Sequence, residues 1–207
     1  MIAAVPSRED ARDALLSRGN TLAELPSGAR VGTSSLRRQA LLRAARPDLE
    51  FLELRGNLDT RLRKLDEGQY DAIVLACAGL ARMGWEDRIT ERIPVEVCVP
   101  APGQGALALE ARSDDEAARA LLAPLHDPNT GVAVAAERAF QSVLNAGCTV
   151  PVGAHAIVEG DTLRLIAALA DLEGHHVRRC EERGPWSEAE EIGVRAAQAI
   201  LAADERE

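Results

Sequence analysis

The strongest constraint on the fold is an alternation of apolar strands and amphipathic helices between residues 29 and 76. The pattern predicts, in order, a strand at 29–32, a helix to about residue 45, a strand at 49–54, a helix from residue 58 and a strand at 71–76. The last strand is apolar without interruption, which is typical of strands buried on both faces. Strands that alternate with helices are joined by right-handed crossovers, so this part of the chain predicts a parallel α/β sheet.

Polar and basic residues follow the first predicted strand directly. Ser34 or Ser35 can cap the next helix, and Arg37 and Arg38 then lie in its first turn. Two cations cost stability there, because the free backbone N–H groups and the helix dipole already favour anions. Either the guanidinium groups point into water or an anionic ligand compensates them. The adjacent arginines behind two hydroxyls favour an anion site.

Arginines also follow the other two predicted strands. Arg55 and Arg61 come after the second strand, and Arg82 comes after the third. The carboxyl ends of parallel strands meet at one edge of a sheet, where open α/β folds bind ligands. Arginine suits bidentate recognition of carboxylate or phosphate. The pattern therefore predicts a crevice for a ligand with several negative groups, although each arginine alone could be an ordinary surface charge.

Composition excludes several classes of function. A net charge of -9 and an aromatic content of 2% argue against nucleic-acid binding. No apolar run approaches membrane-spanning length, and residues 1–6 lack the regions of a signal peptide, so we expect a cytoplasmic protein with no membrane partner. No metal site is expected, because no paired metal-ligand spacing occurs among the cysteines, which are Cys77, Cys98, Cys148 and Cys180.

Three of these cysteines are predicted to carry no chemistry. Cys77 is interpreted as a buried small hydrophobe, Cys98 as part of a less buried strand at 95–99, and Cys180 as incidental on a polar strand. Cys148 differs because it lies in a loop between a helix end and a strand, from which a thiol can reach a neighbouring crevice. A passive surface thiol remains the alternative.

The last third of the chain has a different pattern. It predicts a helix from about residue 130, strands near 150–158, 162–169 and 175–182, and a final helix. Short glycine turns between the strands are typical of hairpins. We expect a small α+β domain with an antiparallel sheet, set off by breaks rich in proline and glycine at 100–105 and 124–129.

Taken in order along nearly the whole chain, the motifs resemble those of the porphobilinogen deaminase (hydroxymethylbilane synthase) family. They are Val31 to Gln39, Leu54 to Asn57 with Thr60 to Leu62, Tyr70 to Ile73, Ala78 to Leu80 with Arg82, Pro100 to Leu107, Ala136 to Arg138, and Gly147 to Gly153.

The resemblance implies a fold of periplasmic-binding-protein-like parallel-sheet domains plus a small C-terminal α+β domain. It also implies that the N-terminal part of the first such domain is lacking. The expected divisions are a remnant of the first domain at 1–9, an arginine-lined α/β domain at 10–99, a crossing segment at 100–127 that returns to the incomplete first domain, and the cofactor-attachment domain at 128–207.

The resemblance further implies a transferase that joins four porphobilinogen molecules, with release of ammonia, into hydroxymethylbilane for tetrapyrrole biosynthesis. By the same resemblance, Cys148 holds a dipyrromethane cofactor through a thioether. The remaining implied site residues are Ser35, Arg37, Arg38, Arg55 and Arg61 for the cofactor, and Arg82 and Thr33 for the substrate.

The family places its catalytic carboxylate in an N-terminal segment that we expect this sequence to lack, so no catalytic acid is assigned and the chain alone is expected to be inactive. The family implies a monomer, although an exposed sheet edge at 106–110 could favour self-association. Two alternatives stay open. One is a non-catalytic module that binds small anions, and the other is a thiol enzyme that uses Cys148.

Overall fold

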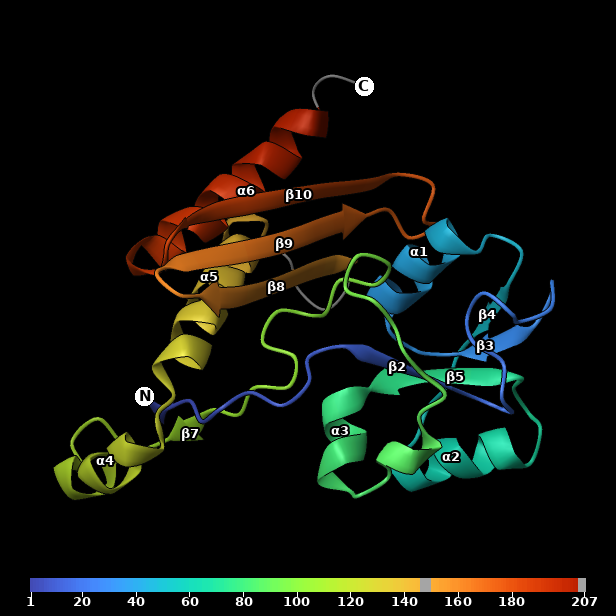
Figure 1. The fold of residues 1–207 in the computed structure, drawn as a ribbon, viewed down its shortest axis with the longest axis horizontal. Coiled ribbons are helices and arrows are strands. Elements are labelled where there is room, and N and C mark those ends of the chain that lie inside the picture. The colour runs from blue at the N-terminus through green and yellow to red at the C-terminus, as the bar shows by residue number, and fades with distance from the viewer. Residues whose placement is uncertain (146–149, 205–207) are drawn as a thin grey trace.

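The computed structural model describes residues 1–145 and 150–204. A five-stranded mixed sheet with the order β4-β3-β5-β2-β6 forms the first unit (Figure 1). Its strands are β2 (Asp13–Ser17), β3 (Arg30–Gly32), β4 (Glu50–Leu52), β5 (Ala72–Ala76) and β6 (Glu91–Arg92). The predicted parallel arrangement is confirmed for β3, β4 and β5. Strand β2 is antiparallel to β5 and β6, a pairing that the repeat did not predict.

Helices cover both faces of this sheet: α1 (Leu36–Ala45) lies on one face, and α2 (Leu58–Asp66) and α3 (Cys77–Arg82) lie on the other (Figure 1). The alternation of side chains along β5 explains this arrangement, because successive residues of a strand face opposite sides. Val74 packs in the core with Leu41 of α1, whereas Ile73 packs with Leu62 of α2. The predicted strand–helix units therefore build a sheet with two separate cores.

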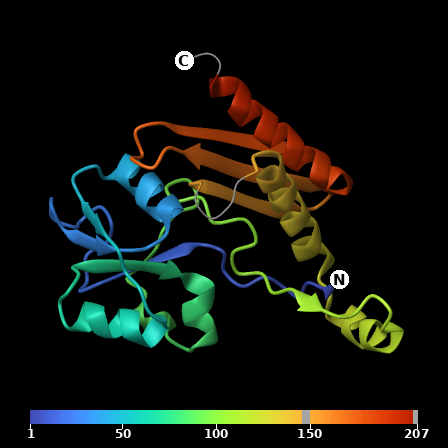
Figure 2. The same ribbon diagram turned by 180° about the vertical axis from the view of Figure 1, so that it is seen from behind.

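The C-terminal unit is the α+β domain that the sequence predicts. Its antiparallel sheet has the order β10-β9-β8, and both long helices cover one face of it (Figure 2). Phe140, Leu163 and Ile192 are fully buried in the core between them. The elements are α5 (Pro128–Val143), β8 (Val152–Glu159), β9 (Thr162–Ala170), β10 (Val177–Pro185), a short 3-10 helix (Trp186–Glu188) and α6 (Ala189–Asp204).

The other face of this sheet packs against the first unit. Ala168 and Ala170 of β9 are buried in the same core as Ala40 and Leu41 of α1. Gly174, in the loop after β9, lies against the backbone of α1, where an added Cβ would come 2.4 Å from the carbonyl oxygen of Ala40. The two units therefore meet across the middle and C-terminal part of helix α1.

A small third region joins the two chain segments that connect these units. Strands β1 (Ile2–Ala4) and β7 (Leu109–Glu110) pair antiparallel. Strand β7 covers only the last two residues of the strand expected at 106–110. Helix α4 (Glu116–Leu122) projects beyond them and buries none of its residues (Figure 1). The remaining short elements are 3-10 helices at Glu86–Arg88 and Ala123–Leu125. Among the described residues, no helix combines the length and apolar character needed to cross a bilayer.

Candidate anion-binding site

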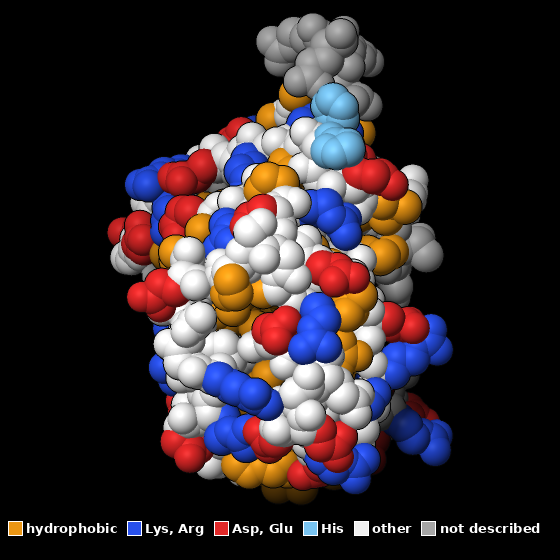
Figure 3. Space-filling view, turned by 90° about the vertical axis from the view of Figure 1, so that its right-hand side faces the viewer, with side chains coloured by type: hydrophobic (Ala, Val, Ile, Leu, Met, Phe, Trp, Pro, Cys, Tyr) orange, Lys and Arg blue, Asp and Glu red, His pale blue; other side chains and the backbone are white. Residues whose placement is uncertain are grey.

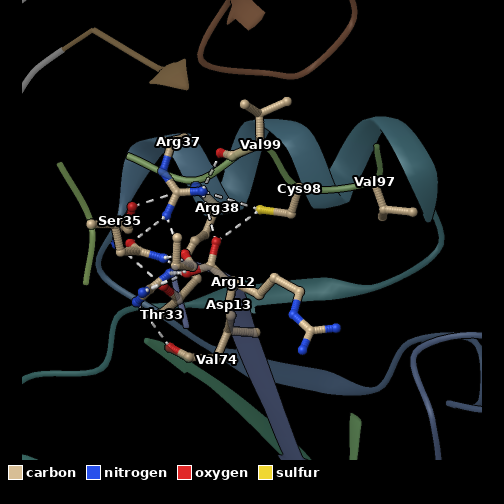
Figure 4. Close-up of polar contacts among 12 residues, drawn as sticks. Arg12, Asp13, Thr33, Ser35, Arg37, Arg38, Val74, Val97, Cys98 and Val99 are labelled. Atoms are coloured by element: carbon tan, nitrogen blue, oxygen red, sulfur yellow. Dashed lines mark hydrogen bonds and ion pairs between the residues drawn. The ribbon is translucent and has the colours of Figure 1, made fainter. Parts of the chain in front are cut away.

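A buried carboxylate organises the start of helix α1. Asp13, on strand β2, is 0% exposed and faces the two arginines of the first turn of α1 (Figure 4). Its Oδ2 accepts a hydrogen bond from Arg37 Nη1 at 2.7 Å, and its Oδ1 accepts one from Arg37 Nη2 at 3.2 Å. Oδ1 also accepts from Arg38 Nε at 2.9 Å and lies 2.7 Å from Arg38 Nη2. One carboxylate therefore pairs with two guanidinium groups, and we call Asp13, Arg37 and Arg38 the Asp13 cluster.

Backbone carbonyls, one amide side chain and one thiol also contact this cluster. Cys98 Sγ accepts from Arg37 Nη1 at 3.3 Å and donates to Asp13 Oδ2 at 3.3 Å. Arg37 Nη1 donates to the carbonyl oxygen of Val99 at 2.6 Å, and Arg38 Nη1 donates to that of Val74 at 3.2 Å (Figure 4). Gln104 accepts from Arg37 Nη2 at 3.3 Å through Oε1 and donates to Asp13 Oδ1 at 2.9 Å through Nε2. Strand β2, helix α1 and the 98–104 loop therefore all meet at Asp13.

The two cations decide the protonation state of Asp13. Burial alone would raise the pKa of this carboxyl group, but Arg37 and Arg38 outweigh burial and hold the pKa well below its usual range. Burial alone would also lower the pKa of the Arg37 guanidinium, and Asp13 instead raises it. All three groups are therefore ionised at neutral pH, so the Asp13 cluster carries one net positive charge.

This arrangement corrects the sequence-based account of Arg37 and Arg38. These arginines were expected to face either water or an external anion, and in neither case would they have a partner within the chain. Asp13 instead pairs with both, and the exposed fractions of Arg37 and Arg38 are 5% and 9%. The cost of cations in a first helical turn is offset by a carboxylate of the same chain. Asp13 ends a charged stretch just before the apolar residues of β2. A carboxylate at the start of a buried strand was the sequence feature that could have indicated a buried ion pair.

Arg61 is the predicted site residue that extends this positive region. It is half-buried on α2, and its Nε donates to the carbonyl oxygen of Gly56 at 2.8 Å. Burial lowers the pKa of the Arg61 guanidinium, and the neighbouring charge of Arg38 lowers it further. Among the described residues no carboxylate pairs with Arg61. A cation destabilised by burial and by a like charge favours an anionic ligand.

The other two predicted arginines form no hydrogen bond or ion pair with the Asp13 cluster within the described residues. Arg55 is 80% exposed and pairs with Glu53 at 2.7 Å. Arg82, at the end of α3, donates from Nη2 to the carbonyl oxygen of Gly105 at 2.7 Å. The structure thus brings Arg37, Arg38 and Arg61 together and leaves Arg55 and Arg82 at the margin.

The hydroxyl groups after β3 shape the loop that leads into α1. Ser35 is the N-cap of α1, as one of the two sequence alternatives proposed, and accepts from the backbone N–H of Arg38 at 3.4 Å. Thr33 is buried and accepts from the backbone N–H of Ser35 at 3.3 Å. Ser34 donates to the carbonyl oxygen of Leu54 at 2.8 Å and accepts from its N–H at 3.1 Å. These bonds hold the ends of β3 and β4 together at the carboxyl edge.

A cavity of about 220 Å³ opens at this edge of the molecule. Its walls come from the start of α1, the 100–104 loop, helix α5 and the start of β8, and include Ser35, Arg37, Gln141 and Val150. Cys148, the predicted cofactor-bearing residue, lies outside the described residues. Gln141 precedes Cys148 in the chain and Val150 follows it, and both line the same cavity as Arg37.

The positive charge of this site is internal. On the molecular face that lies at the right of Figure 1, acidic and basic side chains are interspersed with no broad region of one sign (Figure 3). The protein as a whole carries a net charge of -9. The positive charge beside the start of α1 comes from the buried Asp13 cluster and the half-buried Arg61.

A second buried carboxylate, which the sequence analysis did not identify, joins the two units. Glu137 of α5 is 0% exposed and accepts from Arg8 Nη1 at 2.6 Å and from Arg8 Nη2 at 3.1 Å. It also accepts from the backbone N–H of Gly103 at 2.6 Å and from that of Ala156 at 2.8 Å. Burial raises the pKa of the Glu137 carboxyl group, despite the lowering effect of Arg8. We call Glu137 and Arg8 the Glu137 pair.

His155 adds no second cation to the Glu137 pair. Its Nδ1 lies 3.7 Å from Glu137 Oε1, and this buried atom has no hydrogen-bond partner among the described residues. Burial lowers the pKa of the His155 imidazole to about 4, and the charge of Arg8 lowers it further. His155 is therefore neutral at physiological pH.

The prediction of a less buried strand at 95–99 was wrong. The N–H groups of Val97 and Cys98 both bond to the carbonyl oxygen of Pro94, so the segment turns, and Cys98 is 0% exposed beside the Asp13 cluster. Burial, with a further effect from Asp13, raises the pKa of the Cys98 thiol to about 12. Burial likewise raises the pKa of Cys77 to about 11. Neither thiol forms a reactive thiolate at neutral pH.

The chain is similar to known proteins over most of its length. Residues 1–120 match the family model described as the dipyrromethane cofactor binding domain of porphobilinogen deaminase, and residues 132–202 match its C-terminal domain model. The chain is 51% identical over 193 residues to a porphobilinogen deaminase of Syntrophobacter fumaroxidans, covering 93% of this chain and 62% of that protein. It is 54% identical over 201 residues to one of Roseiflexus castenholzii, covering 97% of this chain and 66% of that protein.

A solved structure gives a weaker likeness. A periplasmic binding protein of Salmonella typhimurium with high arginine specificity matches with a TM-score of 0.38 and 16% identity, over 58% of this chain and 55% of that one. The fold assignment therefore depends on the sheet topology described above. The chain spans 62% to 66% of the length of the two porphobilinogen deaminases, and the two family models together match most of its residues. The chain belongs to the porphobilinogen deaminase family.

Proposed function

We propose that this chain has the function of its family: a transferase that joins four porphobilinogen molecules, with release of ammonia, into hydroxymethylbilane in tetrapyrrole biosynthesis. The observation that carries the proposal is the net positive Asp13 cluster, of which Arg37 lines a cavity together with Gln141, which precedes Cys148 in the chain, and Val150, which follows it. The acetate and propionate groups of pyrroles are small carboxylates. A partly buried group of arginines with one excess charge suits such ligands.

We assign the covalent dipyrromethane cofactor to Cys148. The match of residues 1–120 to a dipyrromethane cofactor binding domain supports this assignment, as do the positions of Gln141 and Val150 in the cavity wall. The arginines fit the group because Arg61 has no carboxylate partner among the described residues and lies within the electrostatic reach of Arg38. When bound, dipyrromethane supplies the pyrrole chain to which further units are added.

The remaining site residues have proposed roles that differ in their freedom to move. Ser35, Arg38 and Arg61 would bind carboxylates of the cofactor, and Arg37 would contribute mainly its charge because its terminal nitrogens are already bonded. Arg55, being exposed, can swing toward a ligand, and Arg82 and Thr33 would contact the incoming porphobilinogen.

Neither buried carboxylate is available to stabilise the pyrrole nitrogens of a cationic intermediate. Asp13 is surrounded by Arg37 and Arg38, and Glu137 is bonded to Arg8 and to two backbone N–H groups. A carboxylate in that role must face the substrate with a free oxygen. The catalytic acid therefore stays unassigned among the described residues.

The domain divisions are also a proposal. Residues 10–99 and 128–207 would be the stable units, because each has its own buried core, and 100–127 would connect them. Limited proteolysis should cut first within 100–105 or 124–129. First cleavage inside 49–75 would contradict these divisions. A monomeric state and a cytoplasmic location stay predictions, of which light scattering on the purified protein tests the first.

The test of the proposed function is the mass of the peptide that contains Cys148. In protein purified from cells, we expect this peptide to carry the added mass of dipyrromethane. The Cys148→Ser variant should gain none, and a Cys180→Ser variant should load normally. An unmodified Cys148 in a chain that still binds carboxylates tightly would instead identify a non-catalytic anion-binding module. Modification by simple thiol reagents with no carboxylate binding would favour a thiol enzyme.

A further inference from the structure

The carboxylate of Asp13 bonds to Arg37, which lines the cavity, and to the adjacent Arg38. We propose that Asp13 is a positioning residue that, together with Gln104, holds Arg37 and Arg38 in the orientation in which this site receives an anion. The inference deepens the proposed function and rests on it, because it concerns the same site. The family comparisons give no role to Asp13, which lies outside the motifs that the sequence analysis identified.

The first argument is the number of bonds that hold Arg37. Nη1 donates to Asp13 Oδ2 and to the carbonyl oxygen of Val99, while Nη2 donates to Asp13 Oδ1 and to Gln104 Oε1. Nη1 also donates to Cys98 Sγ at 3.3 Å, so Nη1 has three acceptors and Nη2 has two. The guanidinium plane cannot rotate without breaking several of these bonds. Arg37 nevertheless lines the cavity, so a fixed cation forms part of its wall.

The second argument is that Arg38 depends on the same carboxylate. Its Nε and Nη2 both lie against Asp13 Oδ1, and its Nη1 donates to the carbonyl oxygen of Val74. Arg38 in turn acts on Arg61, whose pKa it lowers after the larger effect of burial. The position of Asp13 therefore determines where the charge of Arg38 lies relative to Arg61.

The third argument is that Gln104 supports the carboxylate from the opposite side. Its Nε2 donates to Asp13 Oδ1 at 2.9 Å and to the carbonyl oxygen of Ala11 at 2.6 Å, while its Oε1 accepts from Arg37. The amide is therefore bonded to both members of the ion pair. In the Asp13→Asn variant, one carboxylate oxygen becomes an amide nitrogen. That nitrogen repels the facing guanidinium, so the bidentate pairing of Asp13 with Arg37 is lost.

The test compares Asp13→Asn with Glu137→Gln, using inorganic pyrophosphate as the probe. Each substitution replaces a fully buried carboxyl group bonded to arginine with a neutral amide, so net charge alone predicts equal or tighter anion binding in both. If Asp13 positions the arginines, Asp13→Asn weakens pyrophosphate binding by the folded protein by about tenfold or more despite the added positive charge. Glu137→Gln leaves the affinity within about twofold of wild type.

Isothermal titration calorimetry at a temperature where each variant is folded gives these dissociation constants. A second variant, Gln104→Met, keeps the charge of the cluster unchanged and should weaken pyrophosphate binding by a smaller factor, so the test does not depend on the folding of Asp13→Asn. Unchanged or tighter binding in Asp13→Asn, or unchanged binding in Gln104→Met, would overturn the inference. So would a wild-type chain that does not bind pyrophosphate.

Mass analysis of Cys148 in the wild type separates the two proposals. If Cys148 is never modified but Asp13→Asn still loses pyrophosphate affinity, the proposed function fails and the positioning role stands. If Cys148 is modified but pyrophosphate affinity does not depend on Asp13, the positioning role fails alone.

Discussion

Asp13 and Glu137 are both fully buried carboxylates bonded to arginine, yet the protein shifts their pKa values in opposite directions. Burial favours the neutral form of each. Asp13 has two guanidinium partners, which outweigh burial, whereas Glu137 has one guanidinium and two backbone N–H groups, which do not. The comparison shows that the number of cations around a buried acid, and not the presence of an ion pair, decides whether its charge is stabilised.

The two regions are linked through a single loop residue. Gln104 bonds to Asp13 and Arg37 through its side chain, and its backbone carbonyl accepts from Arg8 Nε at 2.8 Å. The Asp13 cluster therefore belongs to the predicted anion site, and the Glu137 pair joins the N-terminal segment, the loop and the C-terminal unit. If this division is correct, disturbing Asp13 affects both stability and anion binding, and disturbing Glu137 affects stability alone.

The largest expected effect comes from Asp13→Ala. This change leaves two buried guanidinium groups without their carboxylate, and we expect it to lower the free energy of unfolding by about 3–5 kcal/mol. Urea denaturation followed by circular dichroism measures the loss. A loss as small as that expected for an exposed acidic residue would show that Arg37 and Arg38 find other partners. It would contradict the claim that Asp13 differs from Glu137 because two cations depend on it.

Glu137→Gln should have a smaller effect at neutral pH. The amide keeps the size of the side chain, and the carboxylate that it replaces is not favoured by its environment, so we expect a loss of about 1–3 kcal/mol. The same urea titration gives the value. A loss larger than that of Asp13→Ala would reverse the order that the numbers of cations predict.

The pH dependence of stability sharpens the contrast, because the two shifts have opposite signs. The pKa of Asp13 is lowered on folding, so its stabilising contribution is present above the ordinary value of 3.8 and is lost as pH falls through the folded pKa. The pKa of Glu137 is raised, so its contribution is present below 4.5 and is lost as pH rises through the folded pKa.

The unfolding free energies of wild type and Glu137→Gln should therefore converge as pH rises above 4.5. Those of wild type and Asp13→Asn should converge as pH falls below 3.8. Each pH unit within a window changes the difference by at most about 1.4 kcal/mol. Thermal or urea unfolding at several pH values measures both trends, and parallel curves for the two variants would contradict the opposite shifts.

The smallest expected effect comes from Asp114→Asn, which serves as the exposed reference. Asp114 pairs with Arg112 at 2.8 Å, and the two side chains are 67% and 81% exposed. Solvent screens such a pair, so the free energy of unfolding should change by less than about 0.5 kcal/mol. A larger change would show that the variants report on overall charge and not on burial.

Local patterns predicted much of the fold. The three parallel strands, the serine cap of α1 and the antiparallel sheet of the C-terminal unit all follow from periodicity and capping chemistry within short windows. Strand β2 was missed because its pairing with β5 is antiparallel and it stands outside the strand–helix repeat.

The partners of the site arginines could not be predicted in the same way. Asp13 and Arg37 are 24 residues apart, and Arg8 and Glu137 are 129 residues apart. No local pattern specifies which charges meet over such separations, because tertiary packing brings them together. The sequence placed Arg37 and Arg38 correctly in the first turn of a helix but could not show that a buried carboxylate faces them.

Titration of the side-chain carboxyl carbons by nuclear magnetic resonance tests this account most directly. In protein labelled with carbon-13, the account predicts that the Asp13 carboxyl titrates below its ordinary pKa of 3.8, or stays ionised until the protein unfolds. It predicts that the Glu137 carboxyl titrates above its ordinary value of 4.5. An Asp13 carboxyl that takes up its proton above 3.8, or above the pH at which Glu137 does, would contradict the claim that two arginines hold Asp13 as a fixed anion.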